Sequence, residues 1–214
     1  MSTADSSLTR EFLLHSLQRL PTPRRYWVGF SGGADSTALL QALDECRADL
    51  PAPVHALHFH HGLQEEASAW QDHCSKFCSD RDIPYLAEKL DIQHGGATSL
   101  EEEARNARYR AVARILDKDE MYLTAHHAED QSETLFLNLM RGSGIEGLAG
   151  IPALRSLDRG WVARPLLDVD RNDLVTFLEK REIPWLEVPS NQDTRFVRYY
   201  LRHALFPELE RRWR

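Results

Sequence analysis

Residues 26–43 constrain the fold more than any other part of this 214-residue chain. They begin with a short run of aromatic and β-branched residues that ends at Phe30, which favours a β-strand. Gly32 and Gly33 interrupt the run, and an apolar pattern with helical spacing begins at Ala38. The sequence therefore predicts a strand, a glycine turn and a helix in immediate succession.

A turn of this kind is suited to binding an anion. Its backbone N–H groups point outward without side chains in the way, next to the positive end of the helix dipole. Ser31, Ser36 and Thr37 add hydroxyl donors, whereas the Asp35 carboxylate would repel phosphate unless a cation lay between them, so Asp35 hints at Mg²⁺. The Walker motif and G-x-G-x-x-G are absent. The simpler alternative is a glycine turn in which Asp35 only caps the helix.

The rest of the chain repeats the alternation of strand and helix patterns. Beyond the first strand, strands are expected over residues 54–59, 84–90, 121–125 and 161–164, with helical patterns between them. We therefore predict an α/β fold, a doubly wound sheet of five parallel strands with helices on both faces. A catalytic domain is expected over residues 1–190, followed by a basic helical segment over residues 191–214.

Composition and charge narrow the class of protein. No apolar run approaches the length that spans a membrane, and the N-terminus has no signal-peptide pattern, so we expect a cytoplasmic protein without a membrane partner. The three cysteines are expected to be packing residues. A formal net charge of -7 argues against a generic nucleic-acid binder, but residues 195–214 carry six arginines against two glutamates. Contact with a polyanion is expected at that end.

Polar side chains follow two predicted strands at their carboxyl ends, where ligands bind in open α/β sheets. His58 and His61 accompany the second strand, and His126 follows the fourth. A histidine metal site is the weaker alternative, because no carboxylate or cysteine stands at a matching spacing in that loop. On the helix expected from about residue 128, Asp130 and Glu133 share one face. They would suit a cationic substrate group and help to remove its proton, or they simply complement the helix dipole.

Two arginines stand out on the helix expected over residues 100–116. Arg108 interrupts its apolar stripe, and Arg105 lies one turn earlier. A snorkelling side chain or a buried ion pair would explain Arg108 structurally. The functional alternative is a pair of guanidinium groups that reach a phosphate or a substrate strand.

The motif S-G-G-A-D-S at residues 31–36 resembles the pyrophosphate loop of the PP-loop ATP pyrophosphatase superfamily. T-A-H-H-A-E-D-Q-S-E-T at 124–134, with R-G-S-G at 141–144, narrows the resemblance to the tRNA(Ile)-lysidine synthetase family. Further matching segments are H-G-L at 61–63, E-A-R-N-A-R-Y at 103–109, R-P-L-L at 164–167 and P-S-N at 189–191. Positions that depart from the family pattern are Gln64, Glu129, Val188 and Tyr199.

The resemblance implies an enzyme that uses ATP and Mg²⁺ to adenylate the wobble cytidine in the CAU anticodon of tRNA(Ile), after which L-lysine displaces AMP. Asp35 would hold Mg²⁺, Asp130 and Glu133 the lysine ammonium, and Arg105 and Arg108 a phosphate or the anticodon base. The ATP-binding residues would be Ser31, Gly32, Gly33, Ala34, Asp35, Ser36, His58, His61 and His126. The tRNA-binding residues would be Arg195, Arg198 and Arg202, ahead of further tRNA-binding domains.

Alternatives from two other classes stay open. One is another PP-loop ligase or a tRNA thiolase, for which Cys74 and Cys78 are poorly spaced as a reactive pair. The other is a non-catalytic module that binds an adenine nucleotide, which would leave Asp130 and Glu133 without a role. A homodimer is compatible with each of them.

Overall fold

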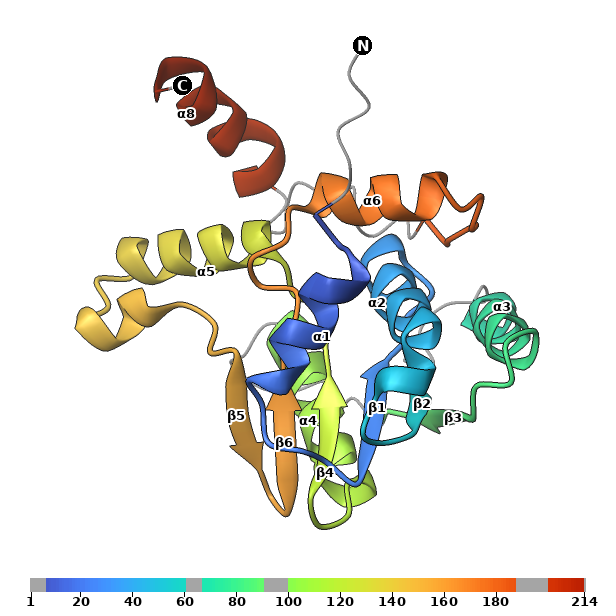
Figure 1. Ribbon diagram of the computed structural model, residues 1–214. Helices are drawn as coiled ribbons and strands as arrows, with labels where there is room; N and C mark the ends of the chain where they lie inside the picture. Colours follow the sequence, from blue (N-terminus) through green and yellow to red (C-terminus); the bar gives the residue numbers. More distant parts are fainter. Residues whose placement is uncertain (1–6, 61–66, 91–99, 188–199, 214) are drawn as a thin grey trace.

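One mostly parallel sheet organises the protein. The computed structural model describes residues 7–60, 67–90, 100–187 and 200–213, and its strands lie in the order β3-β2-β1-β4-β6-β5 (Figure 1). All neighbouring strands pair in parallel except β5, which is antiparallel to β6. The strands are β1 (Arg25–Gly29), β2 (Val54–His60), β3 (Tyr85–Lys89), β4 (Glu120–Leu123), β5 (Leu154–Leu157) and β6 (Gly160–Ala163).

Helices cover both faces of this sheet. The α-helices are α1 (Arg10–Gln18), α2 (Ala34–Glu45), α3 (Ala67–Ser79), α4 (Leu100–Ile115), α5 (Ala128–Met140), α6 (Arg171–Glu179) and α8 (Phe206–Trp213). Short 3₁₀ turns lie at Arg47–Asp49 and Ile145–Ala149, and a π-helical turn at Leu201–Leu205 leads into α8. The core shared by α1, α2, α3 and α6 fills one face, and α4 packs on the other. In Figure 1, α1 and α2 accordingly lie in front of the sheet and α4 behind it.

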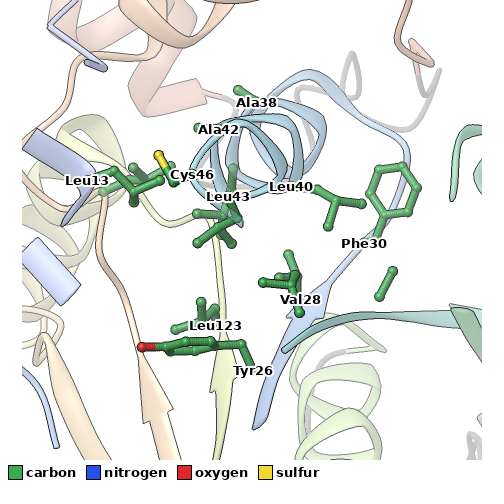
Figure 2. Close-up of a cluster of buried hydrophobic side chains, with 14 of the residues drawn as sticks. Leu13, Tyr26, Val28, Phe30, Ala38, Leu40, Ala42, Leu43, Cys46 and Leu123 are labelled. Atoms are coloured by element: carbon green, nitrogen blue, oxygen red, sulfur yellow. The ribbon is translucent and has the colours of Figure 1, made fainter. Parts of the chain in front are cut away.

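The alternation of side chains along β1 divides the two cores. Tyr26 and Val28 point toward α2, where Figure 2 shows them beneath Leu40 and Leu43. Trp27, between them, belongs to the core beneath α4. The central strands β1, β2, β4 and β6 all contribute buried residues to both cores, so the middle of the sheet is buried on both sides, as parallel sheets usually are.

The predicted fold class is confirmed, but the number of strands is wrong. The predicted fifth strand is β6, and an additional strand, β5, forms a hairpin with it through a turn at Asp158, whose φ is 50°. The sequence of β5 gave little signal, because this edge strand keeps both of its central residues, Arg155 and Ser156, exposed. Within the described residues, no helix is both long and apolar enough to cross a membrane.

The topology also fixes where a ligand would bind. β1 lies between β2 and β4. The chain first builds the sheet on one side of β1, with β2 and β3, and then crosses to the other side with β4. The carboxyl ends of β1 and β4 flank this switch point, which is the usual binding crevice of an open α/β sheet. The glycine turn follows β1, and His126 and His127 follow β4.

Candidate functional site

The glycine turn joins β1 directly to α2, as predicted. The N–H of Phe30 still donates to the Leu57 carbonyl of the neighbouring strand, at 2.9 Å. α2 then begins at Ala34, with Gly33 in extended conformation as its N-cap. The turn therefore opens onto the N-terminus of α2, where free backbone N–H groups and the helix dipole favour an anion.

Serine hydroxyls shape this loop from within. Ser36 Oγ donates to the Gly33 carbonyl at 3.1 Å and accepts from the Ser31 N–H at 3.2 Å. The Ser31 and Ser36 hydroxyls also lie 3.0 Å apart. Two of the three predicted hydroxyl donors are thus ordered by hydrogen bonds within the loop, whereas the third, Thr37, is fully buried, and its Oγ1 has no hydrogen-bond partner among the described residues.

Gly32 is required by both conformation and space. Its φ is +82°, and a Cβ there would lie 2.8 Å from Leu186 Cδ1 and 3.0 Å from Cys74 Sγ. The Leu186 N–H donates to the Gly32 carbonyl at 2.8 Å. The segment that follows α6 therefore holds the loop from outside.

His127 connects the loop to α5. It is the N-cap of α5 and is only 1% exposed. Its Nε2 lies 3.7 Å from Asp35 Oδ2 and 3.5 Å from Asp130 Oδ2, while Nδ1 lies 2.8 Å from Glu129 Oε2. Burial alone would lower the pKa of His127, but the hydrogen bond to Glu129 and the charges of Asp130 and Asp35 outweigh it and raise the pKa. An imidazolium at this position would neutralise carboxylates from two helices.

Asp35 is the residue that the sequence predicts as a magnesium ligand. Among the described residues, its buried Oδ1 has no hydrogen-bond partner, and Arg171 Nε approaches it only to 3.4 Å. Desolvation raises the pKa of Asp35, an effect that the charges of His127 and Arg171 oppose. No group of three or more His, Cys, Asp or Glu in the described part of the chain could hold a metal ion by itself. Mg²⁺ often needs just one or two carboxylates together with phosphate oxygens, so Asp35 beside a phosphate loop fits it.

Asp130 and Glu133 converge on one cation. Arg202, from the π-helical turn, donates from Nε to Glu133 Oε1 at 2.8 Å, and its Nη2 lies 3.6 Å from Asp130 Oδ1. Glu133 is 1% exposed, whereas a third of the Arg202 side chain is exposed. The other oxygen of Asp130 accepts the His127 N–H at 3.0 Å, so Asp130 also caps α5. The pair therefore contacts a cation of the protein itself, and Asp130 in addition lies in the acidic first turn of α5, where its charge complements the helix dipole.

The predicted histidine ligands have structural contacts. His58 is buried, and its Nδ1 lies 2.9 Å from the Phe30 carbonyl, so it holds the end of β1 as a neutral donor. Burial lowers the pKa of His58. His126 Nδ1 lies 2.7 Å from Thr124 Oγ1 at the end of β4. Predicted site residues and departures from the family pattern that lie outside the described residues are His61, Gln64, Val188, Arg195, Arg198 and Tyr199.

Arg105 and Arg108 lie elsewhere. Both are on α4, which packs on the sheet face opposite α2. Arg105 is exposed, with its guanidinium 5.8 Å from the centre of the Tyr109 ring. Arg108 is half-buried, and its charge acts on Tyr122, a residue of the second core. The described contacts bring the loop, Asp130 and Glu133 together and leave the two arginines in a separate cluster.

Sequence reasoning missed three residues at this site: His127, Glu129 and Arg171. Glu129 accepts the Arg171 N–H at 3.0 Å and thereby ties α5 to the N-terminus of α6. Burial raises the pKa of Glu129, but the hydrogen bonds from His127 and from backbone N–H groups, together with the charge of His127, outweigh it, so the net pKa is lowered. His127 lies three positions before Asp130 in the sequence, and this spacing was a usable signal that His127 belongs to the site. Arg171 had none, because its partner Asp35 lies more than a hundred positions earlier.

Comparison with known proteins finds close relatives of this chain. The chain is 43% identical over 203 residues to the tRNA(Ile)-lysidine synthase of Pseudomonas syringae pv. tomato, covering 94% of this chain and 45% of that protein. It is 45% identical over 187 residues to the tRNA(Ile)-lysidine synthase of Pseudomonas aeruginosa, covering 87% and 42%. The chain therefore spans less than half the length of these curated relatives.

A solved structure shows the same fold at low sequence identity. The U34-tRNA thiolase of Methanococcus maripaludis, determined with its [4Fe-4S] cluster, superposes with a TM-score of 0.77 at 17% identity, covering 95% of this chain and 72% of that one. At this identity the likeness concerns the fold. The PP-loop domain family matches residues 5–209, which is nearly the whole chain, and the chain therefore belongs to the PP-loop domain family.

Proposed function

We propose that this chain is the ATP-dependent adenylating part of a tRNA(Ile)-lysidine synthase. The observation that carries the proposal is the convergence of Asp130 and Glu133 on one cation, with the His127 imidazole joining Asp130 to Asp35 of the loop. An anion loop beside a carboxylate pair fits an enzyme that brings ATP and an ammonium group together. The curated relatives that carry this name support the assignment.

The proposed reaction has two steps. First, the carbonyl oxygen at carbon 2 of the wobble cytidine attacks the α-phosphorus of ATP, and the bond to pyrophosphate breaks. Second, the unprotonated ε-amine of lysine attacks carbon 2 of the base, and the bond to AMP breaks. Asp130 or Glu133 would accept the proton that the lysine ammonium loses before this attack.

The loop would bind the leaving pyrophosphate. Its N–H groups and the Ser31 and Ser36 hydroxyls face the N-terminus of α2, where negative charge is favoured. Asp35 would hold Mg²⁺, which when bound neutralises charge on the phosphates. Arg171, close to Asp35, would keep that carboxylate oriented.

Asp130 and Glu133 would select lysine by its charge. At about 4 Å a carboxylate and an ammonium attract by about 4 kcal/mol at a surface-like effective dielectric. Arg202 contacts both carboxylates, so lysine would have to displace it. The displaced guanidinium would then be free for the RNA contact that the sequence predicts for Arg202.

The test is pyrophosphate release from ATP and Mg²⁺ with a CAU-anticodon tRNA(Ile), with and without lysine. We expect release to require this RNA and mass spectrometry to find lysine covalently attached to it. Added sulfur in the RNA would instead indicate a thiolase. No release alongside clear ATP binding would indicate a nucleotide-binding module.

Asp130→Asn separates lysine binding from ATP binding. Asparagine can still cap α5, but the substitution removes a charged partner of the ammonium. The lysine concentration that gives half-maximal activity should therefore rise about tenfold or more. ATP affinity should stay within about twofold. The control is Asp80→Asn, which alters an exposed carboxylate directly after α3 that pairs with Lys76. An unchanged lysine requirement in Asp130→Asn would refute the role of this carboxylate.

The thiolase alternative receives no support from the cysteines. All three, Cys46, Cys74 and Cys78, are buried and free. Burial raises the pKa of Cys74 and of Cys78 to about 12, which suppresses the thiolate that sulfur transfer needs.

A further inference from the structure

Three arginines from separate segments surround Tyr109 on α4. The guanidinium of Arg155, from β5, lies 4.6 Å from the centre of the Tyr109 ring, and that of Arg105 lies 5.8 Å from it. Arg164, which directly follows β6, donates from Nη2 to the Tyr109 hydroxyl at 3.2 Å. These four residues are called the Tyr109 cluster below.

The charge of this cluster is not balanced by acidic side chains. Among residues 7–60, 67–90, 100–187 and 200–213, no carboxylate forms an ion pair with Arg105, Arg155 or Arg164. Other exposed arginines of the same region do have such partners, as Arg159 has Asp117. Like charges gathered around one ring repel each other, and an anion would relieve that repulsion.

Arg164 adds a second observation, because it is a buried cation that is incompletely satisfied. It is 3% exposed and donates to the Pro152 carbonyl at 2.7 Å and to Tyr109. In the described part of the chain its Nε has no hydrogen-bond partner. Burial lowers the pKa of Arg164, and the charges of Arg155 and Arg105 act in the same direction. Buried charges are normally paired, so this arrangement is costly unless an anion joins it.

The cluster lies at the same edge of the sheet as the phosphate loop. Arg164 directly follows the last residue of β6, and its N–H donates to the carbonyl of Ala153, which directly precedes β5. α4 ends at Ile115, shortly before β4 begins, so its N-terminal end, with Arg105, lies toward the carboxyl ends of the strands, and Tyr109 lies about one turn further along. The cluster therefore lies toward the carboxyl edge of the sheet, on the face that α4 covers.

We propose that the Tyr109 cluster binds a phosphodiester of the RNA strand whose base reacts at the phosphate loop. Guanidinium groups held over an aromatic ring keep their N–H edges available, and those edges match phosphate oxygens in pairs. Arg105 and Arg155, which are exposed, make the phosphate contacts. Arg164, which is buried, positions Tyr109 through its hydroxyl and adds a positive charge to the cluster. The inference rests on the proposed function, because it takes the substrate to be RNA.

The experiment compares two arginine substitutions on one hairpin. Arg155→Gln removes an exposed member of the cluster, and Arg159→Gln removes an exposed arginine at the opposite end of the same hairpin, where it pairs with Asp117. Binding of a fluorescent CAU anticodon stem-loop RNA is measured by anisotropy over a range of salt concentrations, and ATP binding is measured in parallel.

Arg155→Gln should weaken RNA binding about tenfold and reduce the slope of log affinity against log salt by about 1. Arg159→Gln should change neither quantity, and both variants should bind ATP as the unaltered chain does. Equal RNA affinities for the two variants, or no RNA binding by the unaltered chain, would overturn the inference.

Pyrophosphate release with the same RNA tests the proposed function separately. If release and lysine attachment occur while Arg155→Gln binds RNA normally, the proposed function stands and the phosphodiester site is wrong. If Arg155→Gln loses RNA affinity although no RNA stimulates release, the site stands and the proposed reaction is wrong.

Discussion

Replacing Gly32 by alanine should destabilise the protein severely, because two separate costs coincide at this residue. A left-handed φ of +82° costs an alanine about 1–2 kcal/mol. Its Cβ would also lie 3.0 Å from the Sγ of the fully buried Cys74 and 2.8 Å from Leu186 Cδ1, and such overpacking costs about 1–3 kcal/mol. Alanine restricts the unfolded chain and so offsets about 0.4–1 kcal/mol, which leaves a loss of about 1–5 kcal/mol.

Two other glycines separate these costs. Gly142 has a φ of +68° but no heavy atom within 4 Å of an added Cβ, so Gly142→Ala should lose about 1 kcal/mol from the backbone alone. Gly144 has a φ of -66° and similarly open space, so Gly144→Ala should be neutral or slightly stabilising. The expected order of destabilisation is Gly32→Ala, Gly142→Ala, Gly144→Ala.

Urea unfolding of the three variants tests this order. The midpoint should shift while the denaturant slope stays constant, because a change in slope would mean a change in the surface exposed on unfolding. If Gly32→Ala equals Gly142→Ala within error, the close approach of Cys74 and Leu186 to the loop is refuted. If all three variants match the unaltered chain, the positive φ values are refuted as well.

Two further predictions concern the carboxylate pair and the cysteines. Arg202→Gln removes a cation from the buried Glu133, so urea unfolding should show a loss of about 1–3 kcal/mol in the free energy of unfolding. Added lysine should raise the melting temperature of this variant more than that of the unaltered chain. Unchanged stability would contradict the ion pair. With a pKa of about 12, Cys74 and Cys78 should resist iodoacetamide at pH 8 in the folded protein and react after unfolding, as read by mass spectrometry. Rapid labelling of the folded chain would show that these thiols are accessible.

Local patterns in the sequence predicted the parts of the fold that depend on local chemistry. The strand before Gly32, the glycine turn and the helix after it all follow from spacing within a few residues, although the N-cap of that helix is Gly33 and not the alternative Asp35. The division into domains at residue 190 stays a prediction, since residues 188–199 lie outside the described part of the chain.

Contacts between distant segments could not be predicted in the same way. Asp130 and Glu133 were expected to meet a cation, but nothing in their spacing names Arg202, which comes from a segment about seventy positions later. The antiparallel strand β5 escaped detection because its exposed Arg155 and Ser156 leave no apolar alternation. A charge in a sequence shows that a partner is needed without showing which residue provides it.

The segments that follow the sheet complete both halves of the candidate site. Leu186 holds the loop through its N–H on the Gly32 carbonyl, and Arg202 fills the carboxylate pair at Glu133. His127 joins the two halves, because its ring lies between the carboxylates of Asp35 and Asp130. Displacement of Arg202 by a substrate cation would exchange one positive charge for another beside Asp130, so the charge balance that runs through His127 to Asp35 would be kept. Occupation of the carboxylate pair by lysine should therefore leave ATP affinity at the loop nearly unchanged, so that the coupling free energy between the two halves is close to zero.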